Sequence, residues 1–78
     1  MLQQEEILKA IGVAIQDPKF NLDSNTENTE NWDSLGELAI FTTLAKLTSG
    51  KSDDIPDLFD ISSAAELVMK LRENGLIE

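Results

Sequence analysis

The sequence predicts a small all-α protein, and three observations support this prediction. Apolar residues recur at helical spacing in three separate stretches, Ser-x-x-Glu sequences with the spacing of a helix-capping box open two of these stretches, and no stretch alternates apolar and polar residues as a β-strand does. The 78 residues suffice for one domain, 1–78, near the lower size limit for folding without disulfides. We expect a small four-helix bundle with three longer helices and one short helix.

The first helix is predicted over residues 3–16. Its inward face consists of four aliphatic residues, Ile7, Leu8, Ile11 and Ile15. Asp17-Pro18 ends it, because the residue before a proline avoids the helical conformation. Residues 17–33 then form an unusually long polar loop, which we expect Phe20 and Leu22 to anchor to the core.

The second helix is predicted over residues 34–48. Asp33 and Ser34 are both suited to cap its first turn, and Ser34-x-x-Glu37 has the spacing of a capping box. The predicted inward face is Leu38, Phe41, Ala45 and Thr48, with Leu35, Leu44 and Leu47 beside it. Gly36 lies inside this helix, where a glycine costs about 1 kcal/mol relative to alanine.

A short helix is predicted between the second and the last long helix. Gly50 is expected to take a left-handed conformation after the second helix. Pro56 suits the first position of the short helix. Three apolar residues can anchor this segment, namely Ile55, Leu58 and Phe59.

The last helix is predicted over residues 63–74. Ser63-x-x-Glu66 is the second capping box and opens the helix. The predicted inward face is Ala64, Leu67, Val68 and Leu71. Gly75 ends the helix, and we expect Leu76 and Ile77 to fold back onto the bundle.

The composition argues against several classes of function. A net charge of −9 opposes binding to nucleic acids and to anionic membranes and favours basic protein partners. No apolar run approaches the roughly 18 residues of a membrane span, and the first residues lack the basic region of a signal peptide. We therefore expect a cytoplasmic protein without membrane insertion.

Cysteine and histidine are absent, which removes the usual metal ligands and the commonest general base. No metal site and no catalytic residue are predicted. Residues 23–28 resemble the start of a calcium loop, but the glycine required at the sixth position is Asn28, so we do not predict calcium binding there.

Ser34 places a hydroxyl at a helix N-terminus, where the helix dipole favours a negative group such as a phosphate ester. Ser34 is not predicted to be a catalytic nucleophile, because it lacks a nearby base. From the local sequence alone, the simplest interpretation of Ser34 is an ordinary N-cap. However, Asp33-Ser34-Leu35 resembles the Asp-Ser-Leu motif of the acyl carrier protein family. Length, helix order, acidity and a later Ile55-Pro56-Asp57 extend this resemblance over nearly the whole chain.

The resemblance implies a carrier rather than an enzyme. A phosphopantetheinyl transferase would attach 4′-phosphopantetheine from coenzyme A to Ser34, which makes the chain a phosphoprotein, and the arm would hold an acyl group as a thioester. Asp33 would lie beside the attachment point and help bind the transferase's metal. Leu35 would be an exposed contact for partner enzymes, although the pattern alone equally fits a core leucine.

Further partners implied by the resemblance are an acyl-loading ligase or acyltransferase and a ketosynthase or other acyl-transfer enzymes, acting on a monomeric carrier. Glu37 is the only acidic residue between Ser34 and Thr48, whereas carriers of fatty acid biosynthesis have several there. We therefore expect a specialised carrier of lipid, polyketide or related metabolism rather than a housekeeping member. Two alternatives remain: an aminoacyl or peptidyl carrier of a non-ribosomal or cell-wall pathway, and a helical interaction module without a prosthetic group.

Overall fold

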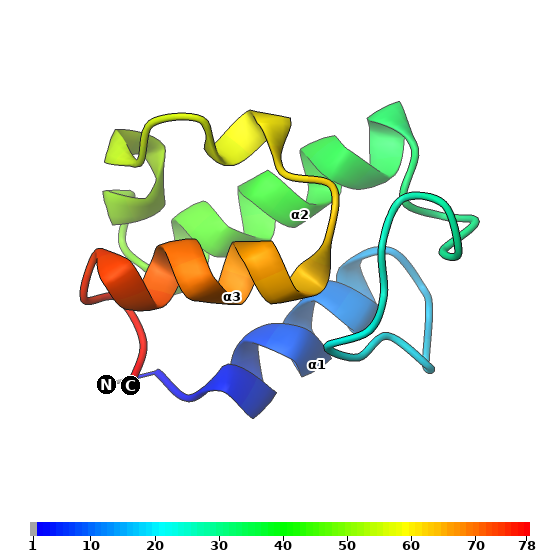
Figure 1. Ribbon diagram of the computed structural model, residues 1–78, viewed down its shortest axis with the longest axis horizontal. Coiled ribbons are helices and arrows are strands. Elements are labelled where there is room, and N and C mark those ends of the chain that lie inside the picture. The colour runs from blue at the N-terminus through cyan, green and yellow to red at the C-terminus, as the bar shows by residue number, and fades with distance from the viewer. Residues whose placement is uncertain (1) are drawn as a thin grey trace.

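The computed structural model describes residues 2–78, apart from the side chain of Phe59. The α-helices of this part of the chain are α1 (Gln4–Ala14), α2 (Ser34–Leu47) and α3 (Ala64–Glu73), and two short 3₁₀ turns, η1 (Lys51–Asp54) and η2 (Leu58–Asp60), separate α2 from α3 (Figure 1). Two isolated β-bridges occur, but residues 2–78 form no strand. The all-α prediction is confirmed, whereas a fourth helix is not.

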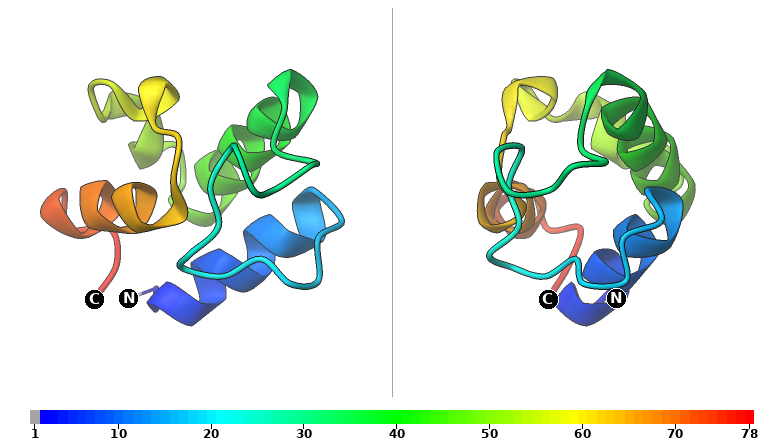
Figure 2. Two further views of the ribbon diagram at one scale, coloured as in Figure 1. Left: turned by 45° about the vertical axis from the view of Figure 1, so that its right-hand side comes forward. Right: turned by 90° about the vertical axis from the view of Figure 1, so that its right-hand side faces the viewer.

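α1 packs against α2 and, over a smaller area, against α3 (Figures 1 and 2). The chain ends lie side by side at the foot of the molecule, where Leu2 and Ile77 form a parallel bridge and the N–H of Glu78 donates to the carbonyl oxygen of Leu2 at 2.9 Å. The predicted return of the chain end is confirmed, since Ile77 is buried and Leu76 is half-buried.

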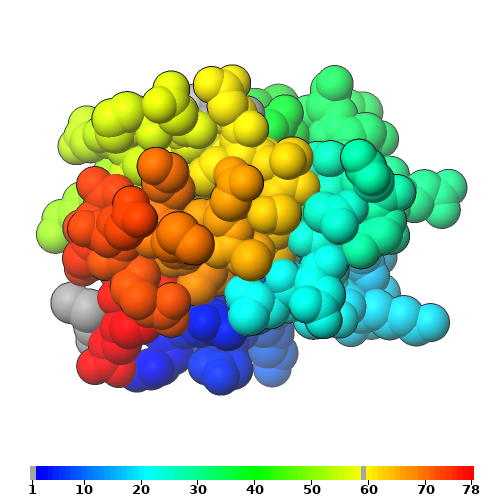
Figure 3. Space-filling model, viewed as in Figure 1, coloured from blue at the N-terminus to red at the C-terminus, as the bar shows by residue number. Residues whose placement is uncertain are grey.

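The long loop before α2 is tied to the start of α3. The N–H of Thr26 donates to the carbonyl oxygen of Ser62 at 2.9 Å, and the N–H of Ala64 donates to that of Ser24 at 2.8 Å. Figure 3 shows the loop, in cyan and blue-green, in direct contact with the yellow and orange start of α3. These bonds hold the middle of the loop against the start of α3 and give partners to backbone groups that would be costly to bury unpaired.

The predicted inward faces of the first and last helices are confirmed. Ile7 and Ile11 of α1, together with Ile15 just beyond it, are buried, and Leu8 is half-buried. In α3 the four predicted residues are all buried, namely Ala64, Leu67, Val68 and Leu71. The Ser63 hydroxyl caps α3 by accepting from the N–H of Glu66 at 3.2 Å, as the capping-box spacing predicts.

The predicted inward face of α2 is wrong. The buried residues of this helix are Gly36, Ile40 and Leu44, followed by Thr48 at its C-terminal end. Leu38 is exposed, and Phe41 and Ala45 are only half-buried. Apolar residues lie around most of this helix, so their spacing does not select one face. Gly36 instead lies on the inward side, where its lack of a side chain lets it approach the backbone carbonyl of Asn31.

Several predicted boundaries and anchors also need correction. α1 is shorter than residues 3–16: Gln3 is its N-cap, with the N–H donating to Glu6 Oε1 at 3.1 Å, and Gln16 already has a φ of +57°. Leu22 is exposed and does not anchor the loop. Phe20 does, together with Trp32, whose ring centroid lies 5.7 Å away.

The segment between α2 and α3 forms two short 3₁₀ turns, η1 and η2, where the sequence predicts one short helix. Pro56 lies between η1 and η2 rather than at a first helical position, and Asp57 after it has a left-handed φ of +62°. Ile55 and Leu58 are buried as predicted, whereas the anchoring role predicted for Phe59 lies outside the described side chains. Gly50 adopts the predicted left-handed conformation, and Gly75 ends α3 in the same way.

Candidate functional site

Ser34 is the first residue of α2, and its side chain is exposed. Within residues 2–78 its hydroxyl has no hydrogen-bond partner. The start of α2 and the turn η2 lie on the same side of the molecule, away from the two chain ends (Figures 1 and 2). A modifying enzyme can therefore approach the Ser34 hydroxyl from solvent.

Asp33, not Ser34, caps α2. Its Oδ1 accepts from the N–H of Gly36 at 2.9 Å, and its carbonyl oxygen accepts from the N–H of Glu37 at 2.7 Å. Asp33 has the extended backbone of an N-cap residue, with φ −108° and ψ −164°. The interpretation of Ser34 as an N-cap in a capping box with Glu37 is wrong by one residue. As a result, the helix does not use the Ser34 hydroxyl.

Leu35 is 79% exposed, so the structure excludes the alternative of a core leucine. Leu38, three residues further along the same face of α2, is 64% exposed. These two side chains, termed here the leucine pair, are large apolar groups in water next to Ser34. Single exposed leucines are common on protein surfaces, whereas two neighbouring ones on one helix face form a small apolar patch.

Two contacts fix the turn before α2. The side-chain amide of Asn31 donates from Nδ2 to the carbonyl oxygen of Ile15, just beyond the end of α1, at 2.9 Å. Trp32 is buried against Phe20, with the two rings tilted by 50°. The buried Nε1 of Trp32 finds no hydrogen-bond partner within residues 2–78. Sequence reasoning missed these supports, although a glycine inside a helical pattern at Gly36 is a recognised sign of close packing.

The acidic residues near this side of the molecule lie in the 3₁₀ segment rather than on α2. Asp53, Asp54, Asp57 and Asp60 are all exposed. On α2 itself the acidic residue is Glu37, which is half-buried. No group of three or more Asp and Glu side chains within residues 2–78 is arranged to hold a metal ion.

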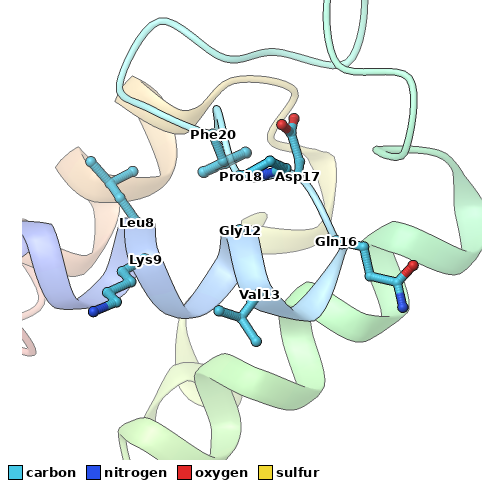
Figure 4. A pocket seen from close by; sticks show the side chains of 8 residues that line it. All are labelled: Leu8, Lys9, Gly12, Val13, Gln16, Asp17, Pro18 and Phe20. Carbon is cyan, nitrogen blue, oxygen red and sulfur yellow. The ribbon is translucent and has the colours of Figure 1, made fainter.

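The hollows on the surface lie away from Ser34. One, of about 400 Å³, follows α1 and the start of the loop, with Val13 and Lys9 on one side and Phe20 on the other (Figure 4). A second, of about 510 Å³, lies between α1 and Thr43 of α2 and shares Val13 and Lys9 with the first. Ser34, Asp33 and Leu35 line neither hollow.

No protein-family model, curated protein or solved structure matches the chain. None of the helices within residues 2–78 has the length and apolar character needed to cross a membrane. The features of the chain that indicate a function are therefore the residues around Ser34 and the motif in which they occur.

Proposed function

We propose that this protein is a phosphopantetheine-dependent acyl carrier that is modified at Ser34. The observation that carries the proposal is the exposed Ser34 hydroxyl at the start of α2, which has no partner within residues 2–78 because Asp33 provides the helix cap. This arrangement fits the Asp-Ser-Leu motif, in which the serine accepts the prosthetic group. The N-terminus of α2 also favours the negative charge of a phosphodiester.

The attachment chemistry belongs to a separate transferase. The Ser34 oxygen would attack the phosphate of coenzyme A that carries pantetheine, a phosphodiester would form, and the nucleotide part of coenzyme A would leave. The chain has no histidine, and the nearest cation along α2, Lys46, lies roughly 18 Å from Ser34 along the helix axis. Ser34 therefore has no activating base on its own helix. When attached, the arm supplies the thiol that holds an acyl group as a thioester.

The surface around Ser34 favours a specialised carrier. Leu35 and Leu38 offer apolar contacts to partner enzymes, whereas α2 offers only Glu37 for electrostatic docking. Partners of this carrier are the transferase, an acyl-loading ligase or acyltransferase, and a ketosynthase or other acyl-transfer enzymes. If the enzymes of primary fatty acid synthesis load and extend this protein as readily as their own carrier, the specialised assignment is wrong.

A mass measurement with matched serine variants tests the proposal. The purified chain is incubated with coenzyme A and a broad-specificity transferase. We expect the intact mass to increase by one phosphopantetheine group in the wild type and in Ser62→Ala, which removes another exposed serine, but not in Ser34→Ala. An unmodified wild type, or an increase that persists in Ser34→Ala, would refute attachment at Ser34.

The leucine pair also supports a second candidate, an interaction module without a prosthetic group. Exposed apolar side chains bind a partner whether or not a prosthetic group is attached. This candidate is favoured if no transferase modifies the folded chain. An aminoacyl or peptidyl carrier would instead accept the arm and differ in which ligase loads its thiol.

A further inference from the structure

We propose that Asn31 and Gly36 are positioning residues that select Asp33 over Ser34 as the cap of α2 and so keep the Ser34 hydroxyl accessible. Two capping registers one residue apart are available in this sequence. Asp33 can accept from the N–H of Gly36, as observed, or Ser34 can accept from the N–H of Glu37. Only the first register leaves the Ser34 oxygen unused. The kinetic consequence of this inference depends on the proposed function, whereas its structural consequence does not.

Gly36 permits the observed register because it has no side chain. A Cβ at this position would collide with the carbonyl oxygen of Asn31 and would lie 3.0 Å from its carbonyl carbon. Both atoms belong to the backbone, so they can move only if the turn itself shifts. The same Cβ would lie 3.5 Å from Asp33 Oδ1, the atom that caps the helix. The last distance is an ordinary van der Waals contact, so the clash falls on the Asn31 carbonyl. Any side chain at position 36 therefore pushes the turn away from the helix, and the Asp33 cap can be lost with it.

Asn31 fixes the other side of this contact. Its Nδ2 donates to the carbonyl oxygen of Ile15, one of the carbonyls left without a partner at the end of α1. The Asn31 backbone thus lies between the end of α1 and the first turn of α2. The side-chain bond holds the Asn31 carbonyl against Gly36, and the close approach of Gly36 in turn holds the Asp33 cap.

Four variants separate positioning from general loss of stability. Asn31→Ala removes the bond to Ile15, and Asn74→Ala is its control, because Asn74 Nδ2 donates to the carbonyl oxygen of Lys70 in the last turn of α3, at 2.8 Å, away from Ser34. Gly36→Ala introduces the clash with Asn31. Gly12→Ala is its control, because a Cβ there would also meet a backbone carbonyl oxygen, that of Asp17 at 2.8 Å, and Phe20 Cβ at 3.3 Å, but none of its three nearest atoms belongs to Asn31 or Asp33.

Amide hydrogen exchange gives the structural readout. In Asn31→Ala we expect the amide of residue 36 to exchange about five- to tenfold faster relative to the amides of α3, because it loses its bond to Asp33 Oδ1. The amide of residue 37 has a partner in either register, the Asp33 carbonyl oxygen or the Ser34 hydroxyl, and should change little. Asn74→Ala should leave both amides within about twofold of the wild type, a margin well below one hydrogen bond. Unchanged exchange of the residue 36 amide in Asn31→Ala would overturn the inference, even if Gly36→Ala fails to fold.

Transferase kinetics give the functional readout. A variant that is only less stable presents less folded substrate, which raises the apparent KM and leaves kcat unchanged. In a variant whose Ser34 hydroxyl caps the helix, the oxygen is less available to the transferase, so kcat should fall. We expect Asn31→Ala and Gly36→Ala to lower kcat severalfold and Gly12→Ala to change KM alone. Equal kcat in all variants would overturn the inference. If the wild type accepts no phosphopantetheine, the proposed function fails, and the exchange data alone decide whether Asn31 and Gly36 select the cap.

Discussion

The side chains of Asp33 and Ser34 are neighbours in the sequence, but the structure uses only one of them to build the helix. Asp33 Oδ1 satisfies the N–H of Gly36, and the Ser34 hydroxyl remains in solvent. Both residue types are good helix caps, so the local sequence could not decide between them. The contact between Gly36 and Asn31 selects Asp33 as the cap. Capping rules do not include this contact, because it joins residues five positions apart.

Trp32 provides a test of the turn at the level of a single residue. Its ring is 6% exposed, and its Nε1 is buried without a partner within residues 2–78. Leaving such a donor unpaired costs about 1–3 kcal/mol. Trp32→Phe removes the donor and keeps the aromatic contact with Phe20, so we expect it to lower the free energy of unfolding by less than about 1 kcal/mol.

Trp32→Ala should cost about 3–5 kcal/mol, because it also empties the space filled by the ring. Urea unfolding of the two variants measures the difference. Equal losses in Trp32→Phe and Trp32→Ala would show that the indole N–H is satisfied and that our description of this turn is incorrect.

At the scale of elements, α1 and α3 were predictable in their position and inward face, whereas α2 was predictable only in its position. α1 and α3 each have one apolar stripe, at Ile7 and Ile11 in α1 and at Leu67 and Leu71 in α3, so their spacing identifies the buried side. α2 is apolar around most of its circumference, and its orientation depends on Gly36 meeting the loop. For the same reason, the apolar pattern of α2 did not predict that Leu38 is exposed.

A matched pair of leucines tests the orientation of α2. Leu44 is fully buried and Leu38 is 64% exposed, although both lie within the same helix. We expect Leu44→Ala to lower the free energy of unfolding by about 2–5 kcal/mol, since it leaves a cavity in the core. Leu38→Ala should change it by less than about 0.5 kcal/mol. Comparable losses at the two positions, measured by chemical denaturation, would mean that α2 is rotated relative to our description.

The 3₁₀ segment shows another limit of the sequence reasoning. Ile55 and Leu58 were identified as anchors from their apolar character, and both are buried. The division of this segment into two 3₁₀ turns was not predicted, because Asp57 takes a left-handed conformation directly after Pro56, which breaks any continuous helix. Such a conformation is rare for residues other than glycine, asparagine and aspartate, so propensity rules give it little weight.

At the scale of the whole molecule, the dominant property is a net charge of −9. The charge was readable from the sequence, and the structure adds that Asp53, Asp54, Asp57 and Asp60 are all exposed in one short segment. Like charges so close together repel one another and destabilise the folded state, and salt screens this repulsion. We therefore expect the melting temperature to rise with sodium chloride concentration, and a flat salt titration would contradict this expectation.

Two charge variants in the same segment sharpen this prediction. Asp57→Asn removes one negative charge and keeps a residue type that tolerates the left-handed backbone. It should raise the melting temperature at low salt by about 2–4 °C, on the basis of about 0.5 kcal/mol for one like-charge pair. Lys51→Gln should act in the opposite direction. If both variants shift the melting temperature in the same direction, repulsion among these aspartates does not control stability.

The most direct measurement of the central claim is the intact mass of the wild-type chain after co-expression with a competent phosphopantetheinyl transferase, followed by fragmentation to locate the added group. We predict one phosphopantetheine per chain, on the peptide that contains Ser34. A folded chain that is purified from these cells with its unmodified mass, or that carries the group on another residue, would contradict the carrier assignment.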